Sequence, residues 1–77
     1  MKFMNLEVKE LVKGEQLGIC RNELCIPFIL NRKEREAVSI SKEYYFQVEI
    51  LSRSLNWKYE WEKEENEIRL HTSYINY

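Results

Sequence analysis

The sequence predicts a small α+β domain, with a small antiparallel sheet of about five strands wrapped around a single helix. Apolar and charged residues alternate over residues 57–62 and again over residues 67–71, after a polar turn, which is typical of a β-hairpin. Directly upstream, apolar residues recur between positions 44 and 55 at the spacing of an amphipathic helix. These patterns predict one helix packed against antiparallel strands.

The first part of the chain is expected to be extended. Residues 3–12 fit either a strand or a helical face, and a strand is favoured because residues 13–16 look like a turn into a following strand. Residues 31–36 are predicted to form a solvated charged loop. Residues 37–40 then form a short strand that precedes the helix.

Between these segments, residues 17–30 predict a hairpin. With Asn22 and Glu23 as its two-residue tip, apolar residues pair on one face and Cys20 faces Cys25 on the other. Pro27 cannot donate a backbone hydrogen bond to a neighbouring strand. It therefore marks an edge or a bulge.

Two positions for the start of the helix agree with the sequence. Ser41 caps it, or residues 44–46 are extended and the helix starts near Gln47. Asn56 is expected to end the helix, because the strand pattern begins at the next residue.

The last hairpin closes if Glu62 pairs with Glu67 across a four-residue loop. The apolar residues of both strands then fall on one side, with Trp61 opposite Ile68 and Tyr59 opposite Leu70. The aromatic residues Trp57, Tyr59 and Trp61 are predicted to pack in the core, against the apolar stripe of the helix.

This region resembles the repeating core of the copper amine oxidase N-terminal-like domain, a small bacterial stalk module, over the run YYFQVEILSRSLNWKYEWEKEENEIRL. The residues at matching places are Leu51, Leu55, Tyr59, Trp61, Asn66, Ile68 and Leu70. Gln47 and Asn56 depart from the Pro and Gly that are usual in the family. The resemblance implies antiparallel strands around one helix and a single domain over residues 1–77. It implies neither catalysis nor a cofactor, because copper ligands are not part of this module.

Composition narrows the classes of function. A chain of 77 residues forms one domain, able to bury only about 60% of the surface that its unfolded chain exposes. Twelve basic and thirteen acidic residues give a formal net charge of −1, which offers no general attraction for nucleic acid or an anionic membrane. A nucleic acid partner is therefore disfavoured.

The sequence contains no apolar run long enough for a signal peptide or a membrane span. The protein is expected in the cytoplasm, and the initiating Met favours a complete small gene product. The alternative is export, as an excised module of a secreted protein, because members of the resembled family are mostly exported.

The two cysteines are the main candidates for chemistry. Directly opposed in a hairpin, Cys20 and Cys25 form a dithiol or a disulfide, and reduced thiols are favoured for a cytoplasmic protein. No metal site is expected, because His71 is the only histidine and lies far along the sequence. No nucleophile–base pair, acid pair or metal set can be assembled, so an enzyme is not expected.

Two groups of side chains point to a partner. Tyr45, Phe46, Tyr74 and Tyr77 cannot all be buried in so small a domain, and exposed aromatic rings are enriched at binding surfaces. The acidic side chains of the last hairpin favour an ordinary solvated face, with an acidic partner-binding edge as the alternative. These residues are Glu60, Glu62, Glu64, Glu65 and Glu67.

Two functional hypotheses follow. The first is a non-catalytic binding module, such as an inhibitor or adaptor encoded by a mobile element. It would act on another protein, on a second copy of itself in a homodimer, or on a small ligand. The second is a redox- or metal-responsive protein that works through Cys20 and Cys25.

Overall fold

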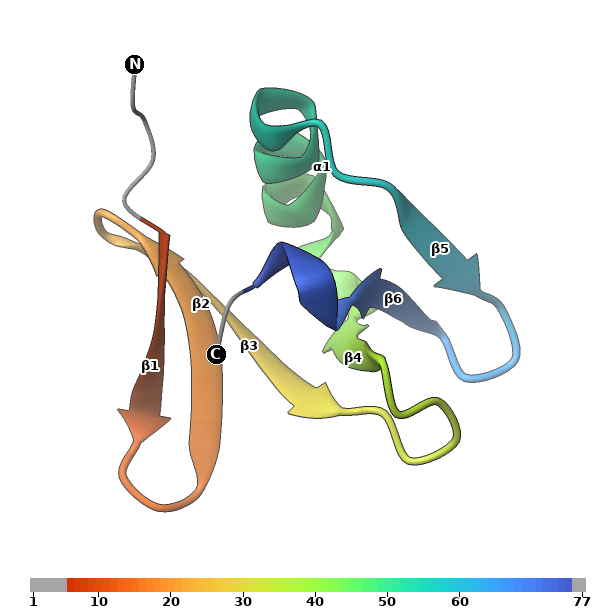
Figure 1. The fold of residues 1–77 in the computed structure, drawn as a ribbon, viewed down its shortest axis with the longest axis horizontal. Coiled ribbons are helices and arrows are strands. Elements are labelled where there is room, and N and C mark those ends of the chain that lie inside the picture. The colour runs from red at the N-terminus through yellow and green to blue at the C-terminus, as the bar shows by residue number, and fades with distance from the viewer. Residues whose placement is uncertain (1–5, 76–77) are drawn as a thin grey trace.

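The computed structural model describes residues 6–75, in which one helix packs against a six-stranded antiparallel sheet (Figure 1). The elements in chain order are β1 (Leu6–Val12), β2 (Gln16–Arg21), β3 (Leu24–Leu30), β4 (Ala37–Ser41), the 3₁₀ helix η1 (Lys42–Tyr44), α1 (Tyr45–Leu55), β5 (Tyr59–Glu62), β6 (Glu67–His71) and the 3₁₀ helix η2 (Thr72–Tyr74). The strand order is β1-β2-β3-β4-β6-β5. The predicted α+β class is confirmed, with six strands rather than about five.

The hairpin of β2 and β3 has the predicted register. Cys20 pairs with Cys25, and Arg21 pairs with Leu24, so the tip is the two-residue turn that the sequence indicated. Asn22 in this turn has a φ of 58°, in the left-handed region that asparagine tolerates better than most residues. β1 adds to β2 as a further antiparallel strand, so the predicted strand over residues 3–12 is confirmed from Leu6, and its first residues lie outside the described part.

β3 connects the two halves of the sheet. Its register with β2 includes Pro27 opposite Gly18, whereas its register with β4 covers Ile29 and Leu30. Pro27 therefore lies where β3 has a partner strand on one side, which is the edge position that its missing N–H requires.

The start of the helix follows one of the two predicted alternatives. The Oγ of Ser41 accepts a hydrogen bond from the backbone N–H of Glu43 at 3.4 Å, and η1 leads directly into α1. The alternative of an extended segment over residues 44–46 is wrong, because this cap lets the helical turn begin earlier. Asn56 ends the helix as predicted, with a φ of 58°.

One hydrophobic core joins the helix to the strands. Its buried members are Ile19, Ile26, Phe28, Val38, Ile40, Val48, Leu51, Trp57, Ile68, Leu70 and Ile75. They come from β2, β3, β4, β6, α1 and the segments that follow α1 and η2, so the helix packs into the curve of the sheet (Figure 1). Among the described residues, no helix is long and apolar enough to cross a membrane.

The last hairpin also has the predicted register, with Trp61 opposite Ile68 and Glu62 opposite Glu67. The aromatic residues of this segment nevertheless differ in burial. Trp57 is in the core, Tyr59 lies at its border, and Trp61 is 42% exposed. The prediction that Trp61 is a core residue is wrong. β5 is an edge strand, so Trp61 has a neighbouring strand on one side only.

Candidate functional site

Four large apolar side chains are exposed around the start of α1 and the adjoining strand β5. Phe46 is 75% exposed, Ile50 58%, Trp61 42% and Tyr45 39%. We call these four residues the aromatic patch. Burying apolar surface is favourable by about 25 cal/mol per Å², so side chains of this size left in water favour association with another surface.

The helical repeat explains why this surface faces outward. Val48 and Leu51 point into the core, whereas Phe46 and Ile50 are four residues apart and share a different side of α1. The ring of Tyr45 connects the helix to β5, because its centroid lies 5.9 Å from that of Phe46 and 6.3 Å from that of Trp61, both in edge-on geometry.

Tyr59 contacts the aromatic patch through Tyr45. Its hydroxyl donates a hydrogen bond to the Glu49 carboxylate and lies 3.4 Å from the hydroxyl of Tyr45. The hydrogen bond to Glu49 raises the pKa of Tyr59 well above its ordinary value, and the contact with Tyr45 and partial burial act in the same direction. The raised pKa disfavours loss of the phenol proton, and the contact between the two hydroxyls links Tyr59 to Tyr45.

The predicted partner-binding residues are only partly brought together. Tyr45 and Phe46 both belong to the aromatic patch. Tyr74 instead stacks on Trp57, with ring centroids 5.7 Å apart, and its hydroxyl accepts a hydrogen bond from the backbone N–H of Lys58 at 3.3 Å. We therefore assign Tyr74 to the structural border of the core. Tyr77 lies outside the described residues.

Two members of the patch were missed from the sequence. The exposure of Ile50 could have been predicted from the helical repeat, because Ile50 follows Phe46 by one helical turn on the side opposite the core. The exposure of Trp61 could not be predicted from the sequence, because Trp61 alternates with charged residues in the same way as the partly buried Tyr59.

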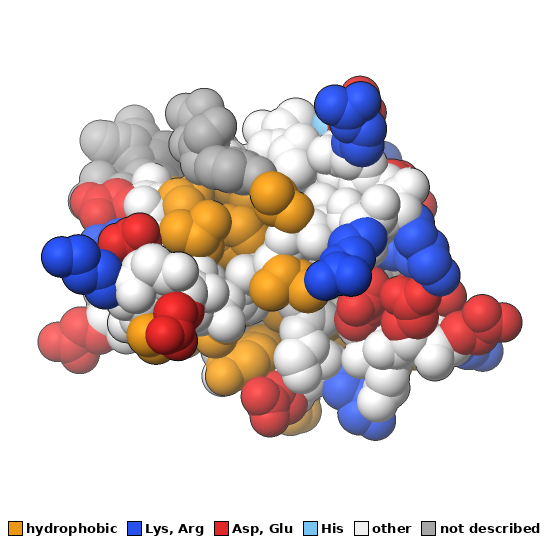
Figure 2. Space-filling model, turned by 90° about the horizontal axis from the view of Figure 1, so that it is seen from below, with side chains coloured by type: hydrophobic (Ala, Val, Ile, Leu, Met, Phe, Trp, Pro, Cys, Tyr) orange, Lys and Arg blue, Asp and Glu red, His pale blue; other side chains and the backbone are white. Residues whose placement is uncertain are grey.

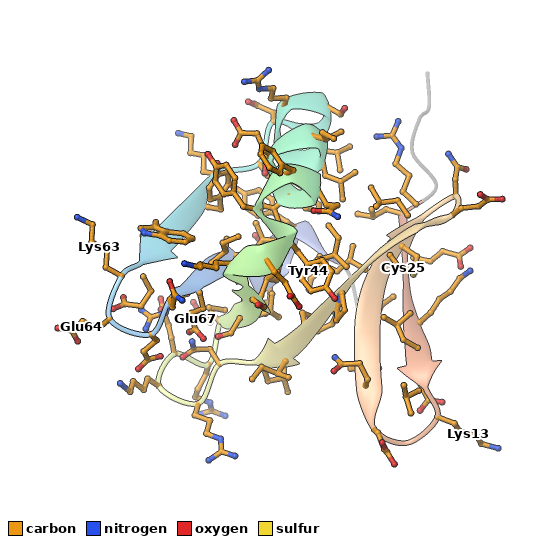
Figure 3. The ribbon with its side chains drawn as sticks, turned by 180° about the vertical axis from the view of Figure 1, so that it is seen from behind. Lys13, Cys25, Tyr44, Lys63, Glu64 and Glu67 are labelled. Atoms are coloured by element: carbon orange, nitrogen blue, oxygen red, sulfur yellow. A yellow bond between two sulfur atoms is a disulfide. The ribbon has the colours of Figure 1, made fainter. Side chains whose placement is uncertain are left out.

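A groove of about 440 Å³ lies between β3, β4, η1 and the β5–β6 turn. Its lining residues are Gln16, Pro27, Phe28, Ile29, Ser39, Ile40, Ser41, Glu43, Tyr44, Glu65, Asn66 and Glu67. Figure 3 shows Tyr44 at the start of the helix and Glu67 at the start of β6, while Glu64 points outward from the turn. The groove thus combines an apolar wall with three carboxylates.

Two of the residues that line the groove, Ser39 and Glu67, belong to a hydrogen-bonded triad with Asn31. The Nδ2 of Asn31 donates to the Oγ of Ser39 at 2.7 Å, and that hydroxyl donates to the Oε2 of Glu67 at 3.0 Å. The Oδ1 of Asn31 also accepts from the backbone N–H groups of Lys33 and Glu34. The predicted solvated loop over residues 31–36 therefore begins with a buried residue, because Asn31 anchors the loop to β4.

Several predicted acidic residues are paired with cations. Arg69, whose side chain is 19% exposed, lies 3.6 Å from the Glu62 carboxylate and 4.0 Å from that of Glu67. Lys33 contacts Glu65 at 2.6 Å. Their hydrogen bond raises the pKa of Lys33 and lowers that of Glu65. These ion pairs fit the predicted solvated face, with charges of both signs.

Cys20 and Cys25 form a disulfide across β2 and β3, with Cα atoms 4.1 Å apart. The sequence favours reduced thiols, but the register places the two side chains directly opposite each other, where a bond can form. In Figure 3, Cys25 lies on the side of the molecule away from Lys63 and Glu67. The disulfide is therefore separate from the groove.

His71 takes no part with the cysteines. Its Nδ1 lies 2.8 Å from the Oγ of Ser73, and its Nε2 lies 3.5 Å from the Glu36 carboxylate. Within residues 6–75, no group of three or more His, Cys, Asp or Glu side chains is arranged to hold a metal ion.

Comparison of the chain with protein-family models, curated proteins and solved structures found no match. The resemblance to the copper amine oxidase N-terminal-like domain therefore stays a prediction from the sequence.

Proposed function

We propose that the protein is a non-catalytic binding module that docks on another protein through the aromatic patch. The observation that carries this proposal is the exposure of three neighbouring aromatic rings, Tyr45, Phe46 and Trp61, with Ile50 exposed one helical turn after Phe46. Aromatic side chains in such clusters are typical energetic centres of protein interfaces. The edge-on ring contacts and the support from Tyr59 hold Tyr45 in place, which lowers the entropy lost on binding.

The arrangement of the polar groups supports a role without catalysis. Ser39 donates to Glu67, as a nucleophile would to a base, but its hydroxyl also accepts from Asn31 and the residue is only 5% exposed. Its oxygen is thus held as a structural link. The hydrogen bond to Glu49 raises the pKa of Tyr59, which disfavours the phenolate that a base would need.

The proposed partner is a different protein, and the alternative is a second copy of this chain. Two copies joined through their aromatic patches would bury the same residues, as in a symmetric dimer. Sedimentation velocity separates these cases. A homodimer shows twice the chain mass and dissociates in the double variant Phe46→Ala/Trp61→Ala, whereas a monomer points to a different protein.

The decisive experiment compares binding by variants of equal fold. Phe46→Ala/Trp61→Ala is expected to lose the partner captured by the wild-type protein, because each anchor typically contributes 2 kcal/mol or more, about thirtyfold in affinity. Leu30→Ala is the matched control, because Leu30 is a 52% exposed apolar residue outside the patch. Equal loss in both variants, or binding unchanged in the double variant, contradicts the proposal.

An inhibitor or adaptor encoded by a mobile element is the form of this function that we favour, with the cytoplasm as its compartment. A second candidate, a redox-responsive protein, is favoured by one observation, the Cys20–Cys25 disulfide. Disulfides persist mainly in oxidising compartments, and a disulfide retained by protein isolated from cells would favour the exported alternative.

A further inference from the structure

β1 and β5 are the two ends of the sheet, and among the described residues each pairs with a strand on one side only. Figure 1 shows them on opposite sides of the molecule. An edge strand leaves backbone N–H and C=O groups free to pair with a further strand. The two edges of this sheet differ in how well a second copy of the same strand fits against them.

The free backbone groups of β1 follow from the registers of the strands. The Cα atoms of Cys20 and Cys25 are 4.1 Å apart, as in a pair that exchanges no backbone hydrogen bonds, where about 4.5 Å is typical rather than about 5.5 Å. Cys20 therefore directs its N–H and C=O toward β1, where Glu7 is its partner. Because these directions alternate along a strand, Val8 directs its own N–H and C=O to the open side of β1.

The charges of β1 are self-complementary about Val8. Glu7 and Lys9 lie on the same face of the strand, with side chains that are 62% and 52% exposed and charged groups 3.6 Å apart. When two copies of β1 pair antiparallel about a two-fold axis at Val8, Glu7 of each copy lies opposite Lys9 of the other. A two-fold axis at Glu7 or at Lys9 would instead place like charges opposite each other, so the charges select one register.

β5 does not have this property. Glu60 and Glu62 share one face of β5, so two β5 strands paired about Trp61 would place carboxylates opposite each other. Figure 2 shows acidic and basic side chains side by side at the end of the molecule that bears β1. At the opposite end it shows a larger group of acidic side chains, with basic ones around it. Charge therefore favours β1 over β5 as the edge that accepts a second copy.

We propose that the protein forms a symmetric homodimer in which the β1 strands of two copies pair antiparallel. The contact spans residues 6–10, because the register shift between Glu10 and Val12 ends the regular edge. Val8 packs against the core on the face opposite the charges, so the two Val8 side chains meet in an apolar contact across the axis. This contact is smaller than a standard interface, and we expect a dissociation constant that is about micromolar or weaker.

The dimer goes beyond the proposed function and uses a different surface. β1 lies at the opposite end of the sheet from β5, which carries Trp61 of the aromatic patch. Two copies joined through β1 therefore leave both aromatic patches open and present them on one assembly. A target with two binding sites would bind such a dimer more tightly than a single copy.

Charge reversal tests the register. Sedimentation velocity of the wild-type protein from about 10 µM to about 1 mM should show the mass rising from one chain toward two. Lys9→Glu and Glu7→Lys should each raise the dissociation constant about tenfold or more, because both ion pairs across the axis become repulsive. An equimolar mixture of the two variants should associate again as heterodimers, because the opposed charges are again of opposite sign.

Lys13→Glu is the matched control for Lys9→Glu. It makes the same change in net charge at an exposed residue of the β1–β2 turn (Figure 3), and it should dimerise like the wild type. The inference is overturned by a wild-type protein that stays monomeric over this range, or by single variants that dimerise as well as the wild type. It is equally overturned if the mixture does not associate, or if Lys13→Glu weakens the dimer as much as Lys9→Glu does.

The two proposals fail in different ways. A dimer that dissociates in Phe46→Ala/Trp61→Ala and persists in Lys9→Glu is joined through the aromatic patch, and the inference on β1 is then wrong. A dimer that persists in Phe46→Ala/Trp61→Ala and dissociates in Lys9→Glu is joined through β1 and leaves the patch free. Capture of a different protein by the patch then decides the proposed function independently.

Discussion

Reduction of the Cys20–Cys25 disulfide is expected to destabilise the folded protein by about 2 kcal/mol. The cysteines are five positions apart. A closed loop of that length lowers the entropy of the unfolded chain by about 7 cal/mol/K, which is about 2 kcal/mol near room temperature. The core lies mainly in the strands and the helix, so the reduced protein is expected to keep its fold. In a domain of this size the midpoint of thermal unfolding should fall by roughly 8–16 °C.

The measurement is thermal unfolding followed by circular dichroism, with and without a phosphine reductant. The variant Cys20→Ala/Cys25→Ala is the control, and its midpoint should not respond to the reductant. Intact mass before reduction tells whether the two thiol hydrogens are missing. The reasoning is refuted if the wild-type protein carries two free thiols before any reductant is added. It is also refuted if the reductant lowers the midpoint of thermal unfolding equally in the wild type and the variant.

Three further predictions concern the core, the helix end and the phenol of Tyr59. Leu51→Ala should destabilise the domain by about 2–5 kcal/mol in urea unfolding, because Leu51 is fully buried, whereas Arg53→Ala on the exposed side should change little. Asn56→Ala should lower the free energy of unfolding by about 1 kcal/mol, because alanine resists the left-handed conformation of this residue. Asn56→Gly should not destabilise the domain, and an equal loss of stability in both variants would show that the backbone conformation is not the cause. The raised pKa of Tyr59 keeps the phenol protonated in the folded state, so stability should fall as pH rises above the ordinary value of 10.0, and Tyr59→Phe should remove this component of the alkaline loss measured in urea.

Local patterns predicted most of the secondary structure. The paired registers of Cys20 with Cys25 and of Trp61 with Ile68 follow from turn length and alternation, because a shift by one residue would turn every apolar side chain to the wrong face. The end of the helix at Asn56 could also be predicted, because asparagine tolerates the left-handed conformation that ends a helix. These features depend on neighbours within a few residues.

The burial of single aromatic residues depends on distant parts of the chain. Trp57 stacks with Tyr74, a residue that its aromatic character alone assigns to a binding surface, and Trp61 is exposed on β5 at the edge of the sheet. The strand order that decides this has β4 pairing with β6 rather than with β5. Alternation alone cannot distinguish a strand between two neighbours from one at the edge.

The same strand order creates the groove. Because β4 pairs with β6, Ser39 comes to lie opposite Arg69 and Ser41 opposite Glu67. Asn31, from the loop before β4, then reaches both Ser39 and Glu67. Glu67 was predicted from the sequence as one of several carboxylates on a solvated hairpin, without any reason to separate it from Glu64. What distinguishes the two is the long-range contact with Asn31 and Ser39. Because Glu67→Ala removes the acceptor and Glu64→Ala removes an exposed side chain, the first substitution should lower the free energy of unfolding in urea more than the second.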